Sequence, residues 1–350
     1  MGAMPSNWTE LQSFLFNRSM SMRIVSLIPS GTEIVAFLGA QGLLVGRSHE
    51  CDFPESVQDV PVLTSQRTQY DPGGGVDAKM IDSQVSESIQ SGESLYQIDI
   101  QRLIDLEPDL IITQDLCSVC SIDLDSVVQA VESMPGKPEI LALNPKTIED
   151  IFDDIYRVGK AIGFEREARQ GVVNLNQRLD RAQEHINPYD DGPVCGFMEW
   201  TDPIYVAGHW TVQLIERAGA RHPLNEAVRK PHSGAAVGPQ QAERIAGHSI
   251  AVPAELFCAT SPKHLVIAPC GLNLEQARAE ADRLFSDTDW FRTLPAVVEG
   301  RVAIVDGNQM FNRSGPRVID AMEFLVGWLG DRAHLIPDDF PWKLWTPPGE

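Results

Sequence analysis

The chain has 350 residues, of which 43% are hydrophobic and 22% are charged. This composition is typical of globular proteins, and the length suits two lobes of roughly 120 to 160 residues each. No run approaches the roughly eighteen apolar residues of a membrane span. The net charge of -21 makes nucleic acid and anionic membrane surfaces poor partners, because both would repel most of the surface, although the acidity could equally serve only solubility.

The first segment, residues 1–21, lacks the basic region, apolar run and small-residue cleavage site of a secretory signal peptide. We interpret it as an N-terminal extension, or as residues added to the natural chain. The six cysteines suit reduced thiols, a metal site or a redox site better than a dense disulfide scaffold. The sequence as it stands predicts a cytoplasmic protein, or a periplasmic or extracellular one if a leader was removed.

Residues 22–145 are predicted to form an N-terminal α/β lobe. A short apolar strand at Arg23–Leu27 precedes a turn at Pro29–Thr32 and a helix at Glu33–Leu38, which Gly39 ends. The next apolar run, residues 43–48, completes a compact parallel βαβ unit.

The rest of this lobe alternates in the same way. Residues 64–98 are polar and indicate a long loop that leads into one helix around Ala78–Ser91. A further helix and a strand ending near Thr113 follow, then a loop that holds Cys117 and Cys120, and an apolar strand closes the lobe.

A helical segment, residues 146–188, is expected to connect the lobes. Its first part repeats apolar residues at steps of three and four from Ile148 to Ile162, and Gly163 can end it. A second helix begins near Glu165 and stops at Asn187 and Pro188. This segment is either a stiff bridge or an ordinary crossover helix inside one large domain.

Residues 189–335 are predicted to form a second α/β lobe, followed by an extended tail at residues 336–350. Strands at Val194–Trp200, 264–271 and 301–307 alternate with helices at Thr211–Ala218, 274–287 and 317–330. The predicted fold is α/β, with two Rossmann-like lobes that have parallel-type sheets and are joined by a single long backbone helix.

Conspicuous polar, thiol and aromatic residues follow the predicted strands. Ligands of parallel α/β sheets lie beyond the carboxyl ends of the strands, so we expect these side chains to line one cleft. They are Ser30, Thr32, His49, Glu50, Cys51, Asp52, Gln114, Asp115, Cys117, Cys120, Glu199, Trp200, Asp202, His209, Trp210, Cys270, Asp306, Asn308 and Phe311.

Seven segments in order carry a family resemblance: SLIPSGTEIVAFLG, SHECDFP, SGESLYQID, PDLIITQDLCSVC, EWTDPIYVAGHW, LVIAPCG and VDGNQMFNRSGPRVIDAMEFL. They resemble the cobalamin-binding, vitamin-uptake type of ABC transporter substrate-binding protein, and in particular a branch that carries these cysteines and no signal peptide. The resemblance runs from about Met22 to Leu329. It implies the class III periplasmic-binding-protein fold, transport with a permease partner, and a small-molecule ligand.

For a corrinoid ligand, a large disc with a polar fringe, a site needs aromatic walls and scattered polar groups. Candidate walls are Tyr96, Trp200, Tyr205, Trp210 and Phe311, although each ring could instead pack in a core. Ser30, Thr32, Glu50, Asp202 and Asn308 are candidate polar contacts. Either His49 or His209 could occupy an axial position of cobalt, because neutral imidazole ligates such metals.

The alternative hypothesis is a site for zinc or another transition metal, or a thiol site. Cys117 and Cys120 have the spacing of half a zinc knuckle, and His49, Cys51, His209 and Cys270 could complete the ligand set. A conventional enzyme is the third option. No nucleophile elbow, Walker A loop or zincin motif occurs, and Glu199 near His209 is as readily a structural hydrogen bond, so we predict no catalysis.

Overall fold

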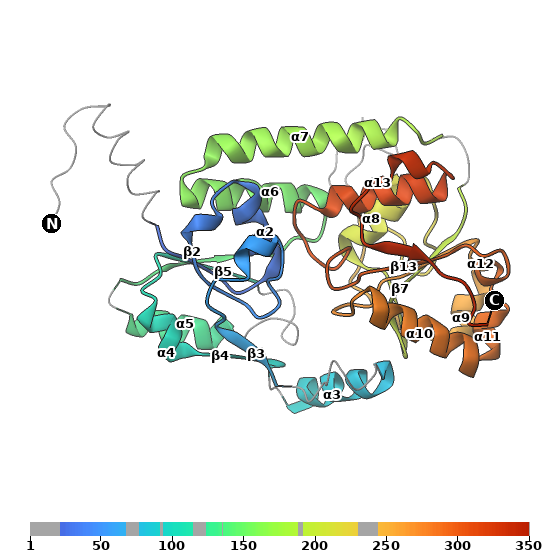
Figure 1. The fold of residues 1–350 in the computed structure, drawn as a ribbon, viewed down its shortest axis with the longest axis horizontal. Coiled ribbons are helices and arrows are strands. Elements are labelled where there is room, and N and C mark those ends of the chain that lie inside the picture. The colour runs from blue at the N-terminus through green and yellow to red at the C-terminus, as the bar shows by residue number, and fades with distance from the viewer. Residues whose placement is uncertain are drawn as a thin grey trace. The chain divides into compact units, whose positions relative to one another are not determined.

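The computed structural model describes residues 22–67, 77–91, 94–114, 124–134, 136–187, 192–229 and 244–349. Two compact units make up the chain (Figure 1). Unit 1 contains Met1–Gln69, Gln84–Pro145 and Asp150–Asn174, and unit 2 contains Tyr70–Ser83, Lys146–Glu149 and Leu175–Glu350. Each unit is therefore assembled from separated stretches of the sequence.

Unit 1 is built on a four-stranded parallel sheet of order β2-β1-β5-β6. Its strands are β1 (Ile24–Ser26), β2 (Leu44–Arg47), β5 (Leu110–Thr113) and β6 (Glu139–Ala142). β1 and β5 are buried throughout, as strands covered on both faces require. Helix α2 (Pro29–Phe37) begins with the residues predicted as a turn, because Pro29 is pre-organised for the first helical position.

An antiparallel pair in unit 1 was not predicted. β3 (Thr64–Gln66) pairs with β4 (Tyr96–Ile98), and Gln66 lies opposite Tyr96. The polar sequence of this region predicts a loop and one helix, and the helix, α3 (Ala78–Ser91), is confirmed. The remaining elements of this part of the chain are η1 (Gln41–Leu43), η2 (Glu55–Val57), α4 (Ile100–Asp105) and α5 (Leu124–Ser133).

Two helices occupy the predicted helical segment, α6 (Ile148–Ile162) and α7 (Glu165–Gln183). Gly163 separates them with a φ of +80°, a conformation that favours glycine. A Cβ atom at Gly159 would lie 2.4 Å from the Cβ of Ala168, so this glycine permits the close approach of α6 and α7. The role of the segment as a stiff bridge stays a prediction.

Unit 2 contains a six-stranded mixed sheet of order β11-β8-β7-β12-β13-β14. The strands are β7 (Cys195–Thr201), β8 (Ile204–Val206), β11 (Ile250–Val252), β12 (His264–Ile267), β13 (Val302–Val305) and β14 (Trp342–Leu344). β7, β12 and β13 are parallel, as predicted, but β8, β11 and β14 run antiparallel to their neighbours. The predicted strands therefore form the parallel centre of the sheet, and the antiparallel strands at its edges were not predicted.

Helices surround the sheet of unit 2 in Figure 1. They are α8 (His209–Arg217), α9 (Ala254–Ala259), α10 (Leu274–Asp287), α11 (Asp289–Arg292), α12 (Pro295–Val298), α13 (Val318–Leu329) and η3 (Ala333–Leu335), with a short pair of strands, β9 (Val228–Arg229) and β10 (Arg244–Ile245). A capping box at Asn273 and Gln276 starts α10.

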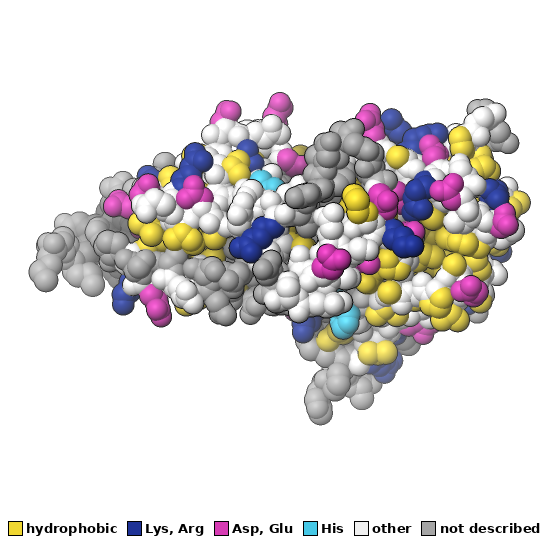
Figure 2. Space-filling model, turned by 90° about the horizontal axis from the view of Figure 1, so that it is seen from below, with side chains coloured by type: hydrophobic (Ala, Val, Ile, Leu, Met, Phe, Trp, Pro, Cys, Tyr) yellow, Lys and Arg dark blue, Asp and Glu magenta, His cyan; other side chains and the backbone are white. Residues whose placement is uncertain are grey.

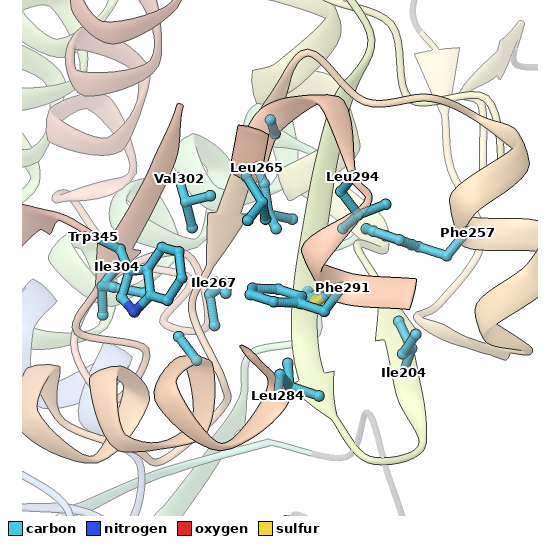
Figure 3. Packing of buried hydrophobic residues seen from close by; sticks show 14 of the residues in the cluster. Ile204, Phe257, Leu265, Ile267, Leu284, Phe291, Leu294, Val302, Ile304 and Trp345 are labelled. Atoms are coloured by element: carbon cyan, nitrogen blue, oxygen red, sulfur yellow. The ribbon is translucent and has the colours of Figure 1, made fainter. Parts of the chain in front are cut away.

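The core of unit 2 lies between this sheet and α9 to α12 (Figure 3). Trp345, directly after β14, is 1% exposed and packs edge-on against Phe285 and Phe291. Its indole N–H donates a hydrogen bond to the Oδ1 atom of Asp282 at 2.7 Å. The extended tail predicted after residue 335 thus supplies both an edge strand and a core residue.

Substitution of Trp345 by Ala should lower the free energy of unfolding by about 3–5 kcal/mol, because it empties a large buried site. The neighbouring Leu344 side chain is 50% exposed, so Leu344→Ala should change the free energy by less than about 0.5 kcal/mol. Chemical denaturation of both variants measures the difference. Equal stability of the two variants would contradict the assignment of Trp345 to the core.

Candidate functional site

A hydrogen-bonded group of side chains lies after the carboxyl end of β2 in unit 1. We call Ser48, His49, Glu50, Thr64 and Tyr96 the His49 cluster. The Oγ1 atom of Thr64 lies 2.7 Å from Nδ1 of His49 and accepts a hydrogen bond from the backbone N–H of His49 at 3.0 Å. The Thr64 hydroxyl donates to Oγ of Ser48 at 3.1 Å.

Tyr96 from β4 completes the His49 cluster. Its hydroxyl donates to Oε1 of Glu50 at 3.0 Å, and its ring centroid lies 5.4 Å from that of His49. Burial lowers the pKa of His49; the carboxylate of Glu50 opposes this effect and the guanidinium of Arg47 adds to it. The imidazole is therefore neutral at pH 7, the form that ligates metals.

Sequence reasoning proposed His49, Glu50 and Tyr96 but missed Ser48 and Thr64. Thr64 contributes because the unpredicted pair of β3 and β4 places it beside the loop after β2. A β-branched residue at the start of a short strand was the signal that could have indicated it.

Ser30, Thr32 and Cys51 are interior residues of unit 1. Ser30 is 4% exposed, and Thr32 and Cys51 are fully buried. The Thr32 hydroxyl donates a hydrogen bond to Sγ of Cys51 at 3.0 Å. These residues support the loop after β2 from within, so a contact with a ligand would first require their exposure.

Two aromatic side chains lie at the carboxyl end of β7 in unit 2. Trp200 and Tyr205 are direct neighbours across β7 and β8, and both are half-buried. The indole N–H of Trp200 donates to the carbonyl oxygen of Ala78 at 3.1 Å. Asp202, in the turn between the strands, lies 3.8 Å from Nη1 of Arg283. Trp200, Tyr205 and Asp202 form one partly accessible group, and their role as ligand contacts stays a prediction.

Trp210 and Phe311 lie in the core of unit 2. The indole N–H of Trp210 donates to the carbonyl oxygen of Phe311 at 2.7 Å, and Phe311 is 2% exposed against Phe197. Both rings therefore pack in the core and do not form exposed walls of a ligand site. Asn308 is half-buried in the loop after β13, where its backbone N–H donates to the carbonyl oxygen of Leu272 at 3.0 Å.

His209 begins α8 in unit 2 with a φ of +47°. Its ring stacks on Trp210 at a centroid distance of 5.9 Å and lies 6.4 Å from the ring of His248. The Nδ1 atom is buried and has no hydrogen-bond partner among the described residues. Burial lowers the pKa of His209, and the charges of His248 and Lys146 add to this effect.

The metal hypothesis finds no ligand set in the part of the chain that the structure describes. There, no three or more His, Cys, Asp or Glu side chains are placed to hold a metal ion. Cys117 and Cys120 lie outside the described residues. Cys51 is buried and Cys270 is exposed.

Glu199 has a structural role. Its Oε1 atom accepts a hydrogen bond from the backbone N–H of Gly208 at 3.1 Å, and its Oε2 atom accepts one from the hydroxyl of Ser249. Burial raises the pKa of Glu199 to about 7, and these hydrogen bonds oppose that rise. The carboxyl group thus joins β7 to the segments before α8 and before β11.

Charged side chains of both signs are scattered over the face of the molecule in Figure 2, with hydrophobic side chains between them. Among the described residues visible there, Lys and Arg side chains do not gather into one basic patch. Within the described ranges, no helix is both long enough and apolar enough to cross a bilayer.

Replacement of Glu199 by Gln should flatten the pH dependence of stability. The raised pKa means that the neutral carboxyl stabilises the fold fully below about pH 4.5 and that this stability is lost as pH rises through about 7, by up to about 3 kcal/mol. Gln keeps an acceptor for Gly208 and stays neutral. Denaturation at about pH 5 and about pH 8 should show a smaller loss for Glu199→Gln than for the wild type or for the exposed-site control Glu184→Gln. Identical losses in all three would refute the assignment.

The fold is shared with several solved binding proteins. A periplasmic heme-binding protein from Pseudomonas aeruginosa superposes with a TM-score of 0.60 and 19% identity over 93% of this chain and 96% of its own. The periplasmic heme-binding protein RhuT from Roseiflexus gives 0.63 and 20% over 89% and 99%. The periplasmic vitamin B12 binding protein BtuF of Vibrio cholerae gives 0.58 and 17% over 89% and 97%.

Sequence comparison gives the same result. An uncharacterized ABC transporter substrate-binding lipoprotein of Bacillus subtilis, YvrC, is 24% identical over 321 residues, which cover 91% of this chain and 81% of that protein. The profile of the periplasmic binding protein family matches residues 24–308. The chain therefore belongs to the periplasmic binding protein family, as a non-catalytic solute-binding protein that works with the permease of an ABC transporter.

Proposed function

We propose that the solute is a corrinoid of the cobalamin type. The observation that carries the proposal is two half-buried aromatic groups, Tyr96 beside His49 in unit 1 and Trp200 beside Tyr205 in unit 2. Flat aromatic surfaces suit the faces of a macrocycle, and aromatic side chains supply much of the affinity at binding sites. The vitamin B12 protein among the structural neighbours agrees with this ligand class, although the heme-binding neighbours share the same fold.

Polar groups for the amide arms of the ligand lie next to these rings. In unit 1, Glu50 accompanies His49 and Tyr96, and in unit 2 Asp202 occupies the turn beside Trp200. A corrinoid carries both amide donors and amide acceptors, which carboxylates and hydroxyls can meet. Asn308 remains a candidate contact in the loop after β13.

Capture of such a ligand for a permease favours a location outside the cytoplasm. The Bacillus subtilis relative is described as a lipoprotein, which agrees with this location. A periplasmic or extracellular position for this chain is therefore part of the proposal.

Purified protein mixed with hydroxocobalamin should retain the red ligand through gel filtration at an equimolar ratio. Trp200→Ala and Tyr205→Ala should each weaken binding about tenfold or more, because each removes a large apolar contact. Phe37→Ala is the matched control. Phe37 is 40% exposed at the carboxyl end of α2, so its substitution should leave the affinity unchanged. Absorbance of the eluted fractions measures the ratio of bound ligand to protein, and titration of intrinsic fluorescence measures the affinity.

Colourless protein after this experiment would overturn the corrinoid proposal. Retention of haemin instead of hydroxocobalamin would assign a different macrocycle to the same fold. Stoichiometric zinc by elemental analysis, together with colourless fractions, would support the metal hypothesis.

A further inference from the structure

We propose that Nε2 of His49 ligates the metal of the bound macrocycle and thereby selects corrinoids that have an exchangeable axial position. This inference rests on the proposed function. It adds a direct bond from one named atom of the protein to the ligand, which capture by shape and amide contacts alone does not require.

The two ring nitrogens of His49 have different surroundings. Nδ1 lies 2.7 Å from the Oγ1 atom of Thr64, whereas Nε2 has no hydrogen-bond partner among the described residues. The imidazole is half-buried, so part of the ring remains accessible. Nε2 is therefore the ring nitrogen that no described residue occupies, and it is the donor atom of the proposal.

The hydroxyl of Thr64 determines whether Nε2 carries a free electron pair or a proton. A hydroxyl has one proton and two lone pairs, and the backbone N–H of His49 occupies one lone pair of Thr64. When Thr64 donates its proton to Oγ of Ser48, the second lone pair accepts the N–H at Nδ1, and Nε2 carries a free electron pair. The reverse arrangement would place the proton on Nε2 and prevent ligation.

Metal-binding histidines usually have such a partner on the second nitrogen, which fixes the tautomer and the ring direction. Here the partner is anchored, because Thr64 begins β3 and is 5% exposed. The ring of Tyr96 lies next to the imidazole at a centroid distance of 5.4 Å, and its own hydroxyl is held by Glu50. The His49 cluster thus orients one donor atom before any ligand arrives.

The reaction is a ligand exchange at cobalt. The electron pair of Nε2 forms a Co–N bond while the bond between cobalt and an axial water breaks and the water leaves. No electron is transferred and no proton is lost from His49. Imidazole nitrogen is a stronger donor than water for such a metal, so the exchange favours the protein-bound form.

The experiment uses diaquocobinamide, a corrinoid without a nucleotide base, so that any axial nitrogen must come from the protein. Binding to the wild type should shift the visible absorption bands of the corrinoid. After reduction to the cobalt(II) state, its electron paramagnetic resonance spectrum should show the splitting caused by one axial nitrogen. His49→Gln should abolish both signals.

Two further variants complete the design. Thr64→Val keeps the side-chain shape but removes the hydroxyl, and it should weaken cobinamide binding roughly tenfold to a hundredfold, as loss of such a partner does elsewhere. His185→Ala removes an exposed imidazole outside the His49 cluster and should retain the wild-type spectra.

The outcomes separate this inference from the proposed function. Binding of cobinamide without nitrogen splitting, or unchanged spectra in His49→Gln, would overturn axial ligation and leave corrinoid capture intact. Failure of the wild type to bind any corrinoid would overturn both. Splitting that disappears in His49→Gln and persists in His185→Ala would establish the bond.

Discussion

Parallel pairing of strands that are buried on both faces is the constraint on which both units depend. β1 and β5 in unit 1, and β12 and β13 in unit 2, expose almost no side-chain surface, so they cannot carry ligand contacts themselves. Polar chemistry is thereby confined to the loops that follow the strands. His49 and Glu50 follow β2 and Asp202 follows β7, whereas Tyr96, Trp200 and Tyr205 lie on short or edge-proximal strands beside them.

The sequence predicted the centre of each sheet because apolar runs flanked by helices have few other stable arrangements. It also predicted the break between α6 and α7, since Gly163 is the residue type that a positive φ favours. The resemblance to substrate-binding proteins then gave the fold class, which the family membership of the chain confirms.

The edges were less predictable, for a physical reason. β3, β4 and β14 are three residues long, and their stability comes from neighbours distant in sequence, not from local pattern. Burial of single side chains has the same dependence on distant neighbours. Trp210 and Trp200 follow the same strand region, yet one donates to a carbonyl inside the core and the other lies half-exposed beside Tyr205. No spacing rule distinguishes them.

Helix α3 contributes Ala78–Ser83 to unit 2, although most of that unit comes from Leu175–Glu350. The carbonyl of Ala78 accepts the indole N–H of Trp200, whose codon is translated 122 positions later. During synthesis the Ala78 carbonyl is therefore made well before the Trp200 indole that donates to it. A fragment that starts at Leu175 would lack that acceptor and the Lys146–Glu149 stretch, so such a truncation does not contain the whole of unit 2.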